Sequence, residues 1–186
     1  GGGHTLALRS DGIVSAWGRN TDGQCNVPAL PTGMSYVQIS AGGYHSTALR
    51  SDGALIAWGQ NHDGQTNVPA LPSGLVYDGI ATGMLHTLAR RSDGEVIAWG
   101  RNTFGQTNVP PTPTGVTNVE VAAGQFHSIA LRSDGSLVAW GSNSDGQTNV
   151  PTLPSGLTYT QIDAGAAHTV ALGSNGSIYA WGRNWE

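Results

Sequence analysis

Large and small side chains alternate along the start of the chain, which is the pattern of a β-strand. Over residues 4–9, His4, Leu6 and Leu8 alternate with smaller or polar neighbours, and a period of two places successive side chains on opposite faces of a sheet. Ser10-Asp11-Gly12 follows. An Asp-Gly pair between two such segments predicts a tight hairpin, because both residues tolerate positive φ. The expected second strand covers residues 13–18.

Two more strands are expected before the pattern begins again. The third, residues 24–27, is short and stops at Pro28, which has no amide for further pairing and is typical of a sheet edge. The fourth covers residues 36–41, and Gly42-Gly43 then turns the chain into the next segment. Glycine or proline interrupts every longer window, so the pattern predicts no helix.

The whole pattern returns every 41 residues without insertion or deletion. Histidine and tryptophan mark the period, at His4, His45, His86, His127 and His168 and at Trp17, Trp58, Trp99, Trp140 and Trp181. We divide the single array 1–186 into units 1–41, 42–82, 83–123 and 124–164 and a partial unit 165–186. A fixed period of this size indicates a repeat architecture. Four antiparallel strands per unit, repeated radially, predict an all-β fold, a β-propeller segment of about four and a half blades. A solenoid is the rival, but its coils are usually shorter.

Composition and charge remove several classes of partner. The chain carries a net charge of −4, with eight Lys+Arg, all of them arginine. No basic stripe is present, which argues against a nucleic-acid partner. No apolar run approaches the ~20 residues that a membrane helix needs, so no membrane partner is expected. Cys25 is the only cysteine and excludes an internal disulfide.

The repeated polar residues have structural explanations. Successive blades pack about 10 Å apart, whereas all ligands of one zinc ion lie about 2 Å from it, so the histidine series cannot form one metal site. We expect each imidazole to bond the backbone where the chain turns into its strand. The aspartates at Asp11 and its equivalents are turn residues. No catalytic set or phosphate loop stands out, so we predict a protein without enzyme activity, cofactor or metal.

The positions that vary between units indicate function better than those that repeat. Two loops vary most: the one before each histidine and the one before each Gly-Gln pair. In an up-and-down blade both loops emerge on one face, where exposed apolar and aromatic residues suggest a recognition surface. The alternative is that some of these side chains tuck between blades. The expected partner-binding residues are Tyr44, His62, Asp63, Met84, Leu85, Thr103, Phe104, Phe126 and Trp185.

The repeating pattern Gly-x-x-His-[Ser/Thr]-x-Ala-Leu-x-Ser-Asp-Gly-x-x-x-Ala-Trp-Gly-x-Asn-x-x-Gly-Gln-Thr-Asn-Val-Pro resembles the regulator of chromosome condensation repeat. It is most similar to the compact bacterial repeats of the second β-lactamase inhibitory protein. The resemblance implies a ring of typically seven blades, with residues 36–41 as the innermost strand of a blade. It also implies that the chain begins in the second strand of one blade and stops after the third of another. We therefore expect a piece of a longer protein, self-association, or missing blades supplied by another chain.

The resemblance also implies a mode of binding. In the inhibitor, aromatic and acidic residues of these two loops hold the target enzyme. Tyr44 and Phe126 match the aromatic place before the histidine, and Thr103-Phe104 and Asp63 match the aromatic and acidic places before Gly-Gln, whereas Ala166-Ala167 and Gly43 do not match. The leading hypothesis is a scaffold that binds a protein. An inhibitor of a β-lactamase or cell-wall enzyme, a carbohydrate-binding propeller and a purely structural repeat stay open, and an extracellular or bacterial cell-surface location is favoured.

Overall fold

The computed structural model describes residues 1–184, and within this range every regular element is a β-strand. The strands are β1 (His4–Leu8), β2 (Val14–Gly18), β3 (Tyr36–Ala41), β4 (His45–Arg50), β5 (Leu55–Gly59), β6 (Tyr77–Thr82), β7 (His86–Arg91), β8 (Val96–Gly100), β9 (Asn118–Ala123), β10 (His127–Arg132), β11 (Leu137–Gly141), β12 (Tyr159–Ala164), β13 (His168–Gly173) and β14 (Ile178–Gly182).

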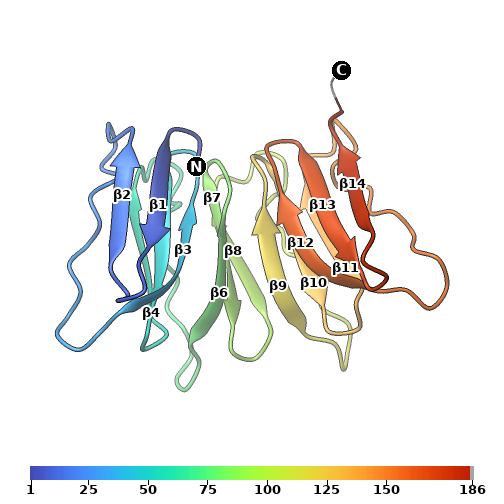
Figure 1. Ribbon diagram of the computed structural model, residues 1–186, viewed down its shortest axis with the longest axis horizontal. Coiled ribbons are helices and arrows are strands. Elements are labelled where there is room, and N and C mark those ends of the chain that lie inside the picture. The colour runs from blue at the N-terminus through green and yellow to red at the C-terminus, as the bar shows by residue number, and fades with distance from the viewer. Residues whose placement is uncertain (185–186) are drawn as a thin grey trace.

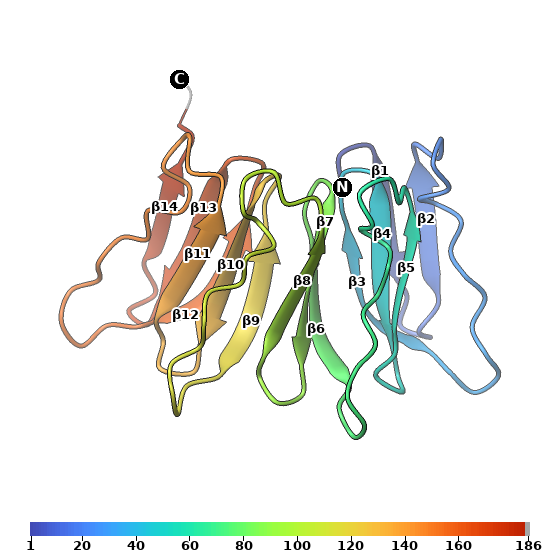
Figure 2. The same ribbon diagram turned by 180° about the vertical axis from the view of Figure 1, so that it is seen from behind.

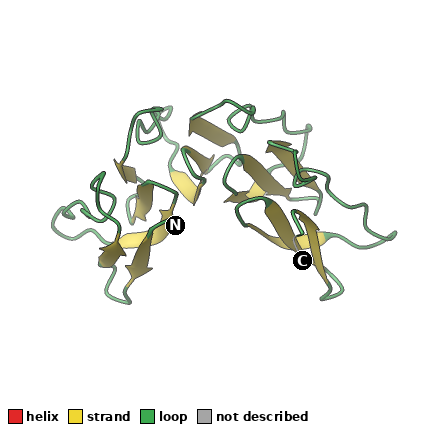
Figure 3. Ribbon diagram, turned by 90° about the horizontal axis from the view of Figure 1, so that it is seen from above, coloured by secondary structure: helices red, strands yellow, loops and turns green. Residues whose placement is uncertain are grey.

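The strands form five antiparallel sheets, and each three-stranded sheet joins the last strand of one sequence unit to the first two strands of the next. β1 and β2 make a two-stranded sheet, and the four that follow have three strands each, in the orders β3-β4-β5, β6-β7-β8, β9-β10-β11 and β12-β13-β14. The sheets stand side by side in an open arc (Figures 1 and 3). The first strand of each three-stranded sheet contacts its counterpart in the next, which places these strands at the inside of the arc. The all-β, blade-by-blade architecture is confirmed.

All five predicted Asp-Gly or Asn-Gly hairpins are present, but their turn differs from the expected one. Only the glycine has positive φ, 78° at Gly12, and no described residue other than glycine does. Asp11 instead accepts the amide of Ile13 through Oδ1 at 3.1 Å. The Gly12 amide bonds the Arg9 carbonyl, and the Arg9 amide bonds the Ile13 carbonyl. This is a three-residue turn with a glycine bulge. Only the glycine adopts the left-handed conformation, and the hydrogen bond from the Ile13 amide to the Asp11 carboxylate stabilises the turn.

The expected outer strand at residues 24–27 and its equivalents is the main departure from a four-stranded blade. These residues form a tight turn and then an extended segment without strand pairing. Gln24 is fully buried there, and its carbonyl accepts hydrogen bonds from the neighbouring blade rather than from a strand beside it. The segment therefore joins two blades together instead of completing its own sheet.

The core lies between the blades. Trp58 of β5 packs against Val14 of the preceding blade, together with Tyr36 and Ala48. Trp58 and Trp140 are only 8% and 7% exposed, and Leu49, Leu131 and Ile80 are buried as well. Trp99 packs against the next cluster but is only half-buried. Each interface thus consists of apolar side chains from two facing sheets.

A hydrogen-bonded network crosses every interface beside this core. The Trp58 indole N–H and the Ser46 hydroxyl both donate to the Gln24 carbonyl, at 3.0 and 2.8 Å. Because the Ser46 proton is used in this way, its oxygen accepts the Nε2 proton of His4, 2.8 Å away. The same network recurs at three further interfaces, through His45 and Thr87, His86 and Ser128, and His127 and Thr169.

The network corrects the expected role of the histidines. His4, His45, His86 and His127 each bond a hydroxyl of the next blade, not the backbone at their own turns. His45 is fully buried, and burial, with smaller contributions from His86 and His4, lowers its pKa to about 3. Burial likewise lowers the pKa of His86 and of His127 to about 4. These imidazoles are neutral parts of the interface.

Candidate binding face

Both variable loops of each unit emerge on the same side of the arc, as the sequence predicts. Strands β4, β7, β10 and β13 begin at this edge, and β2, β5, β8, β11 and β14 end there (Figures 1 and 2). We call it the loop face and define it by residues 42–44, 83–85, 124–126 and 165–167 with 19–23, 60–64, 101–105 and 142–146. The Asp-Gly hairpins lie on the opposite face.

The Gly-Gln motif holds the second loop in place from below. The Gln106 side chain is fully buried, and its Oε1 accepts the amide of Phe104 at 2.9 Å. Asn102 braces the same loop, because its Oδ1 accepts the Thr107 amide and its Nδ2 donates to Asn108. Gln24, Gln65 and Gln147 support their loops in the same way. The motif fixes the backbone, which leaves the side chains of the two preceding residues to vary.

Gly59 and its equivalents bring the two loops of the face together. The φ of Gly59 is +103°, and a Cβ there would lie 2.8 Å from the Tyr44 carbonyl oxygen. That carbonyl accepts the amide of Gln60, which is the next residue after the glycine. The Trp-Gly pair therefore ends each strand so that the loop before Gly-Gln starts beside the loop before histidine.

An aromatic pair spans two blades on this face. The rings of Phe104 and Phe126 lie 5.3 Å apart at an angle of 52°, within the range of favourable aromatic contacts. Phe126 is half-buried, whereas Phe104 is 50% exposed. Three other units place aspartate where this one has Phe104, namely Asp22, Asp63 and Asp145. The pair is thus a local apolar feature of one interface.

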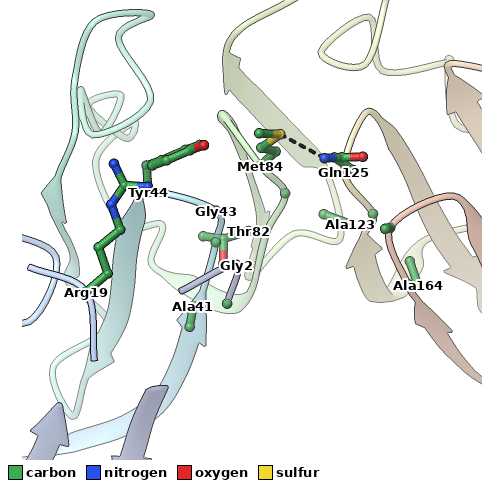
Figure 4. A pocket seen from close by; sticks show the side chains of 16 residues that line it. Gly2, Arg19, Ala41, Gly43, Tyr44, Thr82, Met84, Ala123, Gln125 and Ala164 are labelled. Carbon is green, nitrogen blue, oxygen red and sulfur yellow. Dashed lines mark hydrogen bonds between the residues drawn. The ribbon is translucent and has the colours of Figure 1, made fainter. Parts of the chain in front are cut away.

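A hollow of about 510 Å³ lies at the inner rim of the loop face, where the turns before the histidines come together. Its lining includes Tyr44, Met84, Gln125 and Arg19, with small residues between them (Figure 4). The Arg19 guanidinium lies over the Tyr44 ring, 4.9 Å from its centre, which is a cation–π contact. Gln125 Nε2 donates to the Met84 sulfur at 3.0 Å. Successive turns are joined by backbone bonds such as that from Met84 N to Gln125 O.

The structure places the predicted binding residues as follows. Tyr44 and Met84 are half-buried at the inner rim, Phe126 is half-buried against Phe104, and His62, Asp63, Thr103 and Phe104 are exposed. Leu85 differs from the prediction, because it is 8% exposed and part of the core. Trp185 lies outside the described residues. Whether any of these side chains binds a partner stays a prediction.

Sequence reasoning missed two residues of the hollow, Arg19 and Gln125. Gln125 lies in a loop already recognised as variable, but it is neither aromatic nor charged. Arg19 lies just outside the loops considered. A signal was present, because its column varies between Arg19, Gln60, Arg101, Ser142 and Arg183 while the neighbouring Gly and Asn positions repeat.

Other kinds of site are not found in the described part of the chain. Residues 1–184 contain no group of three or more His, Cys, Asp or Glu side chains that could hold a metal ion. No helix in the same range is long and apolar enough to cross a membrane.

Comparison with known proteins identifies the repeat. The sequence pattern of the "Regulator of chromosome condensation (RCC1) repeat" matches residues 1–24, 36–65, 78–106, 119–147 and 159–184. A search of curated proteins finds no match. Among solved structures, Prp20p from Saccharomyces cerevisiae, reported with its binding properties to Gsp1p and histones, superposes with a TM-score of 0.82 at 27% identity. That match covers 98% of this chain and 56% of Prp20p.

Two further structures agree on the fold. Yeast RCC1 (Prp20), in a crystal structure bound to Kap60, gives a TM-score of 0.79 at 28% identity over 98% of this chain and 54% of its own. Human WBSCR16 gives 0.79 at 21% identity over 98% and 60%, a likeness that concerns the fold alone. The chain thus spans a little over half the length of these propellers.

Proposed function

The chain belongs to the regulator of chromosome condensation (RCC1) repeat family, and on that premise we propose that it is a non-enzymatic scaffold that binds a protein through its loop face. The solved yeast relative is described with protein partners, Gsp1p, histones and Kap60. Those partners belong to a longer chain, so they support a class of partner and not an identity. The proposal includes an extracellular or bacterial cell-surface setting, for which the inhibitor resemblance is the support.

The observation that carries the proposal is the exposed Phe104, which packs on the half-buried Phe126. A half-exposed phenylalanine on a loop tip contributes little to packing, yet its column holds aspartate in three other units. Large aromatic side chains that can fill a pocket on a partner supply much of the binding energy of protein interfaces. Tyr44 and Met84 extend the same surface toward the inner rim.

The alternatives predict different surfaces. A carbohydrate-binding propeller would be served by similar sites in each blade, whereas the loop residues differ from unit to unit. A purely structural repeat would gain nothing from an exposed Phe104. An inhibitor of a β-lactamase or cell-wall enzyme is a narrower form of the same proposal, since it also requires an aromatic loop face.

Self-association or missing blades supplied by another chain is also part of the proposal. Trp17 at one end of the arc is 54% exposed and Ile178 at the other is 73% exposed, whereas equivalent residues inside the arc lie between blades. Light scattering should find assemblies larger than one chain. A monomer that keeps its stability on dilution would contradict this part.

The test of partner binding is a parallel capture experiment with three proteins. Wild type, Phe104→Asp and Ser51→Ala are immobilised and exposed to the same extract, and bound proteins are identified by mass spectrometry. Phe104→Asp installs the residue that other units carry, and Ser51 lies in a hairpin of the opposite face. We expect a protein retained by wild type and Ser51→Ala but lost by Phe104→Asp. A protein lost only with Ser51→Ala would place the binding site on the opposite face, where the Asp-Gly hairpins lie. Captured glycans without a captured protein would favour the carbohydrate alternative.

A further inference from the structure

The hollow at the inner rim offers a positive charge and hydrogen-bond donors but no acid. Of its sixteen described lining residues, none is Asp or Glu, and Arg19 carries the charge. In residues 1–184 Arg19 has no ion pair, unlike Arg50, which pairs with Asp52. Asp22 reaches it only through Thr21, whose hydroxyl accepts Arg19 Nε at 2.9 Å and donates to Asp22 at 3.0 Å.

Arg19 also lacks a hydrogen bond that the equivalent residues of two other units make with the buried glutamine of the Gly-Gln motif. In the second unit the buried Gln65 donates its Nε2 proton to Gln60 Oε1 at 3.2 Å, and in the fourth Gln147 donates to Ser142. With arginine in this column, the side-chain Nε2 of the buried Gln24 has no partner. An unsatisfied buried donor costs free energy, so glutamine would serve the fold better than Arg19 does.

The rest of the hollow suits an apolar side chain. Its walls include Ala41, Ala123 and Ala164, and the unbranched thioether of Met84 lies above them (Figure 4). Methionine adapts to the shape of an apolar partner. Tyr44 faces the hollow with a hydroxyl for which no hydrogen bond is found among the described residues, and the Gln125 amide has only a sulfur acceptor. The hollow therefore combines hydrogen-bond donors with small apolar groups, and suits a ligand that has both a polar and an apolar part.

We propose that this hollow binds an acidic side chain, Asp or Glu, of a protein segment whose adjacent apolar side chain fills the alanine-lined floor. The proposal rests on the loop face being a protein-binding surface and adds the chemistry of the segment. The Tyr44 ring holds the guanidinium in place by the cation–π contact. The guanidinium and the Tyr44 hydroxyl then donate to the carboxylate, and such charge-assisted bonds are stronger than neutral ones.

The test uses a displayed library of random twelve-residue peptides, selected against the immobilised wild-type chain. Selected peptides are titrated by fluorescence anisotropy against wild type, Arg19→Gln and Arg101→Gln. Arg101 is a matched control, because it shares the column of Arg19, donates its Nε to Thr103 at 3.0 Å and leaves Gln106 Nε2 unpartnered. It does not line the hollow.

We expect enriched peptides to carry Asp or Glu beside an apolar residue. Arg19→Gln should weaken their binding at least about tenfold, as expected for a lost hydrogen bond to a charged group, and Arg101→Gln should change it less than about twofold. Replacing the peptide acid by its amide should weaken binding to wild type by a similar factor but have little further effect on Arg19→Gln. Thermal unfolding should place both variants at or above wild type, because glutamine can restore the bond seen at Gln60.

The outcomes separate this inference from the proposed function. Peptides without an acid, equal losses in the two arginine variants, or no enrichment would overturn the carboxylate site. Peptides that lose affinity with Phe104→Asp but not with Arg19→Gln would overturn it while supporting the loop face as a binding surface. Peptides that are insensitive to both changes would contradict the proposed function as well.

Discussion

Trp58 and Phe104 are both large aromatic side chains, but one belongs to the blade interfaces and the other to the loop face. Trp58 lies in a column that holds tryptophan in all five units, is 8% exposed and donates to the Gln24 carbonyl. Phe104 lies in a column that otherwise holds acidic residues, is 50% exposed and contacts Phe126. The interface repeats because each blade must pack on the next, whereas the loop face is free to differ.

The difference separates stability from binding. Substitutions in the repeating network should lower stability and leave the loop face intact, and substitutions on the loop face should do the reverse. Within the repeat, the same residue types also occur in the first and last described sheets, each of which packs against a described sheet on one side only. The end residues therefore serve as controls for those inside.

Acidification should have the largest effect on the interfaces. His45, His86 and His127 have pKa values of about 3 to 4 in the folded chain, lowered by burial from 6.5. Their neutral forms stabilise the fold fully above pH 6.5, and this stability is lost as the pH falls toward the folded pKa, because only the unfolded chain then binds the protons. From pH 7 to 5 the three together should cost roughly 5 kcal/mol.

The measurement is the free energy of unfolding in denaturant at several pH values between 7 and 5. His86→Gln should reduce the slope of the unfolding free energy against pH by ~1.4 kcal/mol per pH unit, which corresponds to one proton. This change in slope does not depend on how much the substitution alters stability at pH 7. Ser51→Ala, which removes no ionisable group, should leave the slope unchanged. A slope that is the same in wild type and His86→Gln would mean that the buried histidines do not govern acid stability.

Removing a buried tryptophan should cost roughly 3–5 kcal/mol. Trp58→Ala loses both its contacts with Val14 and the bond to the Gln24 carbonyl. Trp17→Ala, in the same column but 54% exposed in the single chain, should cost less than about 1 kcal/mol at a dilution at which no assembly forms. Denaturant titration of the two variants gives both values. Equal costs would show that the burial of Trp58 between the blades does not stabilise the protein.

Removing one hydroxyl of the network should have a smaller effect. Thr87→Val keeps the shape of the side chain but leaves His45 Nε2 and the Gln65 carbonyl each without this partner, at a cost of about 1–3 kcal/mol. Thr5 occupies the same column on the exposed face of the first sheet, so Thr5→Val should be nearly neutral. Chemical unfolding of the two variants side by side tests whether the network contributes.

The sequence predicts the fold better than the details of the site. Period-two alternation, Asp-Gly turns and the 41-residue period suffice for the blades. The partner of His45 could not be read from the sequence, because Thr87 belongs to the next unit and meets it only when two sheets pack. Leu85 shares a column with Tyr44 and Phe126, yet its side chain is buried. At the edge of a sheet, equivalent residues of different blades can point either into the core or toward solvent.

The outer segment was misread for a related reason. Its short run before Pro28 has the composition of an edge strand, but the carbonyl of Gln24 is used by Ser46 and Trp58 of another blade. Arg19 was overlooked because its column is polar in every unit. Its position over Tyr44 depends on the relative orientation of adjacent blades, which cannot be read from the sequence pattern.

The most direct test of the account is to measure stability and binding on one variant, Phe104→Asp. The variant replaces the side chain by the one that Asp22, Asp63 and Asp145 supply at the same place. We expect its free energy of unfolding to stay within about 0.5 kcal/mol of wild type, while its affinity for the captured partner falls by roughly 1–3 kcal/mol. A loss of stability with affinity unchanged would instead make Phe104 part of the packing between blades and contradict the separation of interface from loop face.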